Sequence, residues 1–152
     1  MVHRTYQGLG PRENAVREFG ALAPWAVQLF SLQAECGVMD ADDMALRVAL
    51  DGLDTAAYHF TRRRHFYDAL KPRPDPHRKG NGRLRDAGEA VAAFRALTPY
   101  ANRLLALQTR CRPFGYDYCA LEIARQGLET AAFHFTRVEG FYCLKGDAAG
   151  RI

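Results

Sequence analysis

The chain has 152 residues, of which 48% are apolar and 25% are charged, and its formal net charge is +4. This composition is typical of a soluble globular protein, excludes a disordered chain, and suffices for one domain over 1–152 with a buried core. No stretch approaches the roughly 18 apolar residues of a membrane span, and the N-terminal residues lack the apolar segment of a signal peptide. We therefore expect a cytoplasmic protein that does not enter a membrane.

The positive charge is local. Residues 62–85 contain nine Lys or Arg against only two acidic residues, whereas the rest of the chain has twelve basic and fifteen acidic residues. A uniformly basic binding face is therefore not predicted.

The chain resembles itself at an offset of 75 residues. From Ala15/Ala90 to Tyr67/Tyr142 the two halves align without gaps, and 26 of the 53 pairs are identical. The octets TAAYHFTR and TAAFHFTR are the most similar part of this alignment. Such similarity predicts a tandem duplication. The predicted parts are repeat one at 13–71, a linker at 72–87 and repeat two at 88–146.

The first apolar segment of each repeat, about 14–36 and 89–111, has helical spacing. Pro24 and Pro99 interrupt these segments, and a proline inside a helix removes one backbone hydrogen bond. Because the apolar phase continues through the proline, we predict one kinked helix in each repeat.

The second apolar segment of each repeat, about 43–70 and 118–144, also has helical spacing, and Asp42 and Asp117 are the predicted N-caps. About 28 residues at 1.5 Å per residue would form a helix about 40 Å long. The short connections to these helices predict two αα-hairpins. The predicted fold is all-α, a four-helix bundle of two duplicated hairpins related by a pseudo-twofold axis.

Between the repeats, residues 71–88 contain three prolines, three glycines and many charges, and we interpret them as a solvated linker without regular structure. An alternative, less favoured, is that this basic region contacts an acidic protein or nucleic acid. The candidate residues for that contact are Arg63, Arg64, Arg78, Lys79 and Arg83.

The second helix of each repeat carries a row of small residues around Gly52 or Gly127 that ends at His59 or His134. We favour a core histidine bonded to the facing helix; the ring could instead join a polar network with Thr55, Thr61 or Arg62. A third alternative is a ligand, haem or metal site in which the two histidines meet. If the helices cross near the glycines, His59 would face the region of Ala120; if they cross nearer His59, the two rings could approach each other.

Thr55 and Thr130 stand seven residues before Arg62 and Arg137, on one ridge of each helix. These four residues could line two equivalent sites for an anion or partner. We favour the alternative that each arginine caps the end of the facing helix.

No motif for catalysis is found. The four cysteines form no CxxC, CxxCH is missing, and no P-loop, GxSxG or HExxH occurs. No cofactor is predicted, although a haem or metal on the histidines is not excluded. The sequence favours a non-catalytic interaction or regulatory protein that binds a protein partner or a second copy, and an enzyme is the less favoured alternative.

Overall fold

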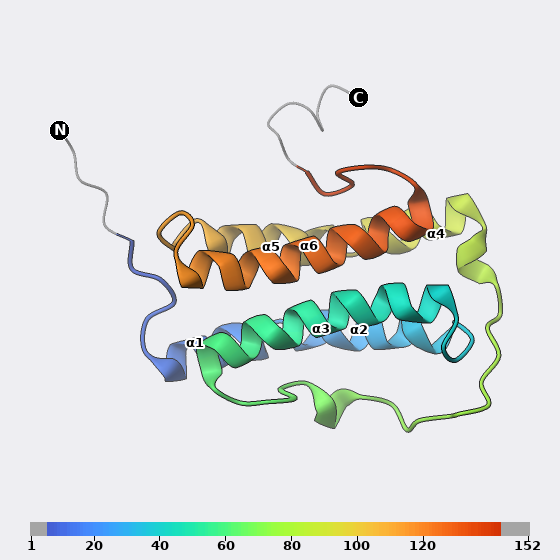
Figure 1. Ribbon diagram of the computed structural model, residues 1–152, viewed down its shortest axis with the longest axis horizontal. Helices are drawn as coiled ribbons and strands as arrows, with labels where there is room; N and C mark the ends of the chain where they lie inside the picture. The colour runs from blue at the N-terminus through green and yellow to red at the C-terminus, as the bar shows by residue number, and fades with distance from the viewer. Residues whose placement is uncertain (1–5, 144–152) are drawn as a thin grey trace.

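The computed structural model describes residues 6–143, and within them it contains six α-helices and no strand (Figure 1). The all-α prediction is confirmed for this range. Two short 3-10 turns, η1 (Asp68–Leu70) and η2 (Arg83–Arg85), lie in the segment between α3 and α4. The helices are α1 (Arg12–Gly20), α2 (Ala23–Ala34), α3 (Ala41–Thr61), α4 (Ala87–Arg95), α5 (Thr98–Gln108) and α6 (Tyr116–Thr136).

The predicted kinked helix is wrong, because the chain forms two helices where one was expected. Pro24 lies in the first turn of α2 and Pro99 in the first turn of α5. A proline has no N–H to donate to the preceding turn, so the first turn of a new helix accommodates it without losing a bond. The apolar phase continues because both helices of each pair contribute to one core, as Phe19 in α1 and Leu29 in α2 show, each with an exposure of 0%.

The two longest helices are shorter than predicted. α3 and α6 each have 21 residues, so each is about 31 Å long rather than about 40 Å. Both end at an arginine in the left-handed conformation, Arg62 and Arg137, with φ of 61° and 59°. They begin after Asp40 and Gly115, so Asp42 and Asp117 lie in the first turn and are not N-caps. Leu144, the predicted end of the second of these helices, lies outside the described residues.

α3 and α6 run antiparallel and make the most extensive contact between helices in the described chain, with α1–α2 behind α3 and α4–α5 behind α6 (Figure 1). The small residues account for this contact. A Cβ added at Gly52 would lie 2.8 Å from the carbonyl oxygen of Ile123, and one added at Gly127 would lie 2.8 Å from that of Val48. Only glycine permits such an approach of two backbones.

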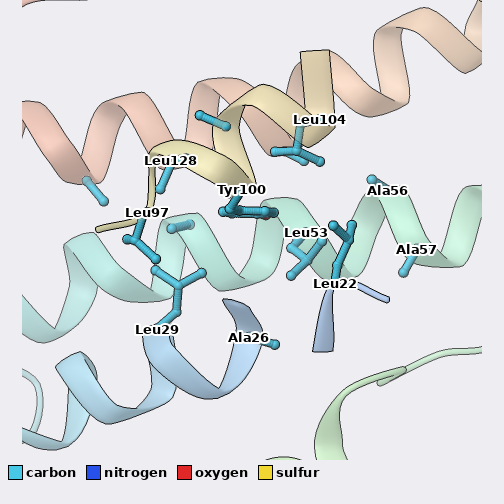
Figure 2. Close-up of a cluster of buried hydrophobic side chains, with 14 of the residues drawn as sticks. Leu22, Ala26, Leu29, Leu53, Ala56, Ala57, Leu97, Tyr100, Leu104 and Leu128 are labelled. Atoms are coloured by element: carbon cyan, nitrogen blue, oxygen red, sulfur yellow. The ribbon is translucent and has the colours of Figure 1, made fainter. Parts of the chain in front are cut away.

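Behind this contact lies a core of leucine, alanine and aromatic side chains. In Figure 2, Tyr100 from α5 lies among leucines from several helices, including Leu22, Leu53 and Leu128. Its ring stacks against Trp25, with centroids 6.5 Å apart. Its hydroxyl is buried and has no hydrogen-bond partner in the described structure.

Two other tyrosines connect the loops after α3 and α6 to the first helix of each half. The Tyr67 hydroxyl donates to the Phe19 carbonyl at 2.6 Å, and the Tyr142 hydroxyl donates to the Phe94 carbonyl. Both phenols are buried, and this burial raises the pKa of each above its ordinary value. Both hydroxyls therefore stay protonated over the usual pH range. Their bonds fasten the loop after α3 to α1 and the loop after α6 to α4.

The segment between the two halves is not simply solvated, contrary to prediction. The Asp43 side chain is fully buried, and its carboxylate accepts a bond from Arg78 at 2.5 Å. Arg78 also donates to the Cys36 carbonyl, while its own carbonyl accepts from Val38 N–H. Residues 78–83 are thus anchored on the turn between α2 and α3.

A second ion pair continues this anchor. Arg83 donates two hydrogen bonds to Glu35, at 2.6 and 2.8 Å, and a third to Glu89 at the start of α4. The bonds from Arg83 hold the pKa of Glu35 below its ordinary value. The carboxylate therefore stays charged at neutral pH, and the pair contributes stability that is lost as the pH falls through that lowered pKa.

Substituting Gly52 by alanine tests the close contact of α3 and α6. The added methyl group would press on the Ile123 carbonyl, and we expect a net loss of about 2 kcal/mol in the free energy of unfolding, measured by urea denaturation. Gly127→Ala should have a similar effect. Gly20→Ala is the matched control, since a Cβ there meets nothing within 4 Å. Equal stability of Gly52→Ala and Gly20→Ala would show that the helices do not touch here.

Substituting Arg78 by methionine tests the anchor. It removes the guanidinium and leaves the buried Asp43 carboxylate without its main partner, so we expect a loss of about 3 kcal/mol in the free energy of unfolding. The exposed Lys79, which has no ion pair in the described chain, supplies the control Lys79→Met, which should change stability by less than about 0.5 kcal/mol. A loose linker would predict the same small change for both variants.

Candidate functional site

His59, in the last turn of α3, contacts the first turn of α6. Its Nε2 lies 2.7 Å from the Asp117 carboxylate, which can only accept, so Nε2 carries the hydrogen. The side chains are 28% and 51% exposed, so this pair lies at the surface. The edge of the ring packs against Phe60, with centroids 4.8 Å apart.

His134 makes the matching contact at the other end. Its Nε2 lies 2.7 Å from the Asp42 carboxylate in the first turn of α3, and its ring packs edge-on against Phe135. Arg85 Nε lies 3.7 Å from the second oxygen of Asp42. The two histidines and the two aspartates are each 75 residues apart, so the same bond closes both ends of the α3–α6 pair.

The structure does not bring His59 and His134 together. His59 contacts the start of α6, and Asp117 and His134 are separated by about 25 Å of helix at 1.5 Å per residue. Of the two arrangements that the sequence allowed, the helices adopt the one that crosses near the glycines. Each imidazole is held by one carboxylate, and within residues 6–143 no three His, Cys, Asp or Glu side chains form a group suited to a metal ion.

Two cavities in the described part of the chain lie away from the histidines. A small cavity of about 10 Å³, about the size of one water, lies between α5 and α6 beside Leu128 and Tyr142. A wider, open depression of about 430 Å³ lies where the anchored linker meets the turn before α3, lined mostly by polar groups. Neither cavity has His59 or His134 in its lining.

The other duplicated candidates lie on the outer side of α3 and α6. Thr55 and Thr130 are exposed. Arg62 and Arg137 end their own helices through backbone bonds to Tyr58 and Phe133, and each guanidinium lies over the ring of that same residue, at 5.8 and 5.6 Å. The predicted cap on the facing helix is therefore not the role these arginines have here.

The basic candidates divide into two groups. Arg78 and Arg83 are used inside the molecule, in the ion pairs with Asp43 and Glu35. Arg63, Arg64 and Lys79 are exposed, and no carboxylate pairs with them in the described part of the chain. Only this second group has its charge available to a partner.

Sequence reasoning missed an exposed stripe along α3 and α6. Residues spaced by three and four turn to the same side of each helix, and on this side the large apolar residues Met44, Val48, Ile123 and Phe133 are 41%, 44%, 47% and 39% exposed. The sequence contains this three- and four-residue spacing, but the spacing alone does not distinguish an exposed apolar stripe from one that faces the core. We call the outer face the stripe formed by Met44, Val48, Asp51, Thr55, Tyr58 and Arg62 of α3 with Cys119, Ile123, Gln126, Thr130, Phe133 and Arg137 of α6.

The cysteines differ in environment. Cys36 and Cys111 are buried, and their burial raises the pKa of these thiols to about 12 and about 11. Cys119 is exposed on the outer face, and Cys143 is partly exposed. The thiolate is the reactive form, so the two buried cysteines are poor nucleophiles at neutral pH.

We expect thiol reactivity to follow this order. With a disulfide reagent near pH 8, Cys119 should react first, whereas fewer than about one in 10³ of the Cys36 and Cys111 thiols would be ionised. Cys119→Ser should remove the fast phase, and the control Cys36→Ser should leave it intact. Raising the pH should speed the slow phase, because the thiolate fraction grows until the pH passes the pKa. Reaction of all four thiols with the reagent at one rate would contradict this assignment.

In comparisons with protein-family models, curated proteins and solved structures, nothing matches this chain. No helix within residues 6–143 combines the length and the apolar character that a membrane crossing requires. The candidate site must therefore be judged on its geometry. That geometry is a surface, formed by two helix faces, rather than a pocket.

Proposed function

We propose that this is a non-catalytic interaction protein that pairs with a second copy of itself through the outer face. The observation that carries the proposal is the row of exposed apolar side chains along α3 and α6, Met44, Val48, Ile123 and Phe133. An exposed apolar patch on a globular protein is typical of an interaction site. A cytoplasmic location remains a prediction from the composition.

In our proposal a duplicated architecture supports this surface. It is a four-helix bundle in which α1–α2 and α4–α5 each take the place of one helix interrupted at the proline, and a pseudo-twofold axis relates its two halves. Contacts that recur 75 residues apart support it. They include the bonds of His59 and His134, the close approach at Gly52 and Gly127, and the matching stacks of Phe19 on Phe60 and Phe94 on Phe135. Such a repeat would present the same residue types on both halves of the outer face.

The size of the outer face fits a second copy. Two adjacent helices, each about 31 Å long and about 10 Å wide, form a face of about 600 Å². A standard interface takes about 800 Å² from each partner, so this face is of the right order. In a twofold dimer the same patch meets itself, which requires that it not carry charge of one sign. The outer face carries both signs, with Asp51 among the arginines.

The alternatives have less geometric support. A haem or metal site on His59 and His134 would need the two rings to share a ligand, whereas each is bonded to a carboxylate at opposite ends of the helix pair. An enzyme would need titratable groups gathered in a cleft. The open depression beside Arg78 contains charged side chains, but its Arg78 is bonded internally.

The mass in solution tests the proposal. We expect the protein, at about 100 µM, to sediment at twice its chain mass of 17.0 kDa, and Val48→Glu/Ile123→Glu to sediment at the chain mass, because burying two carboxylates opposes the interface. Circular dichroism should show unchanged helicity, since both side chains are exposed.

The control is Val27→Glu, an apolar position on α2 with the same degree of exposure, 43%, outside the outer face. It should leave the dimer intact. A monomeric wild-type protein at this concentration would overturn the proposed self-association. A dimer unaffected by Val48→Glu/Ile123→Glu would place the interface elsewhere and overturn the proposed surface.

A further inference from the structure

Three consecutive arginines follow α3 and have no ionic partner. Arg62, Arg63 and Arg64, here called the arginine cluster, are exposed, and no carboxylate pairs with them within residues 6–143. The chain has other arginines that are held, such as Arg78 on Asp43 and Arg83 on Glu35. The cluster is therefore the densest group of basic residues within 62–85 whose charge remains available.

The backbone beneath the cluster is fixed by hydrogen bonds, although its guanidinium groups make no ion pair in the described chain. Arg62 has a left-handed conformation, its N–H donates to the Tyr58 carbonyl, and Arg63 N–H donates to the Thr61 hydroxyl at 3.1 Å. Two guanidinium groups, of Arg62 and Arg64, lie over the Tyr58 ring at 5.8 and 5.1 Å. Stacking on an aromatic ring leaves the N–H groups at the edge of a guanidinium available to an acceptor.

The corresponding turn after α6 shows that the fold does not need this charge. It reads Arg137, Val138, Glu139, yet its backbone makes the same bonds, from Arg137 N–H to Phe133 and from Val138 N–H to Thr136. The backbone bonds of this turn therefore form without the charges of Arg63 and Arg64, which are available to a partner outside the molecule.

Two acidic residues close to the cluster in the sequence have other partners, since Asp68 lies 3.7 Å from His65 and Asp54 accepts from Phe66 N–H. Lys71 and Arg73 follow as further exposed cations without an ion pair in the described chain. Arg62 and Arg64 share the Tyr58 ring, and an anionic partner would relieve the repulsion between their like charges.

We propose that the arginine cluster, with Lys71 and Arg73, binds the phosphate backbone of nucleic acid without reading its sequence. Arginine offers a planar fork of N–H donors that matches two phosphate oxygens, and phosphate contacts release counterions. A membrane-surface site would combine the cations with several exposed apolar side chains, whereas Leu70 is the one large apolar residue exposed among residues 62–79. This inference does not rest on the proposed self-association.

Binding is measured by the fluorescence anisotropy of a labelled DNA duplex of about 20 base pairs, titrated with the full chain from about 50 mM to about 200 mM salt. For Arg63→Ala/Arg64→Ala we expect affinity about tenfold lower at about 50 mM salt, and a slope of log K against log salt smaller by about 2, one for each lost phosphate contact. Arg63→Lys/Arg64→Lys should restore the slope, because lysine keeps the charge.

The matched control is Arg95→Ala/Arg112→Ala, which removes two exposed arginines of the other half that make no ion pair within residues 6–143, and it lowers the net charge equally. It should bind as the wild type does. Absence of binding at about 50 mM salt, or equal losses in the two double variants, would overturn the proposal. So would stronger binding to vesicles of anionic phospholipid than to the duplex. Both double variants should keep the mass of the wild type, whereas Val48→Glu/Ile123→Glu should keep the affinity.

Discussion

At Gly52 and Gly127 the backbones of α3 and α6 approach until a single added carbon would overlap a carbonyl oxygen. This contact sets the register in which the two helices cross, and the register sets what meets at their ends. Because the helices are antiparallel and of equal length, the end of each lies beside the start of the other. His59 therefore meets Asp117, and His134 meets Asp42, instead of the two rings meeting each other.

The two halves differ where they carry charge into the interior. In the first half, the buried Asp43 requires an ion pair with Arg78. Because Arg78 lies in the linker, this pair also anchors the linker. The aligned residue of the second half is Tyr118, so no such anchor is needed there. The halves also differ at the aligned core positions Trp25 and Tyr100, whose rings stack; the Tyr100 hydroxyl has no hydrogen-bond partner within residues 6–143. A lone buried hydroxyl costs stability, which the surrounding leucines and alanines must offset.

Both proposed surfaces consist of side chains that the fold itself does not use. The apolar residues of the outer face point away from the core, and the arginine cluster continues a turn whose backbone bonds also form with Val138 and Glu139 in the second half. Apolar and charged side chains that a fold leaves exposed in this way are typical of a surface that binds an external partner. The His–Asp pairs, by contrast, are satisfied within the molecule.

The sequence alone determined the helical class, the small-residue contact of the two longest helices and the equivalence of residues 75 apart in the alignment. These depend on local spacing and on residue size, which a sequence states directly. Tertiary structure decided that Pro24 and Pro99 begin new helices, that Arg62 and Arg137 end their own helices, and that Arg78 is internal. Each of these depends on which backbone and carboxylate groups lie nearby across the fold. Spacing along one chain does not contain that information. The same apolar period is compatible with one kinked helix or with two helices packed on one core, and the same arginine could lie in a solvated loop or pair with a buried Asp43.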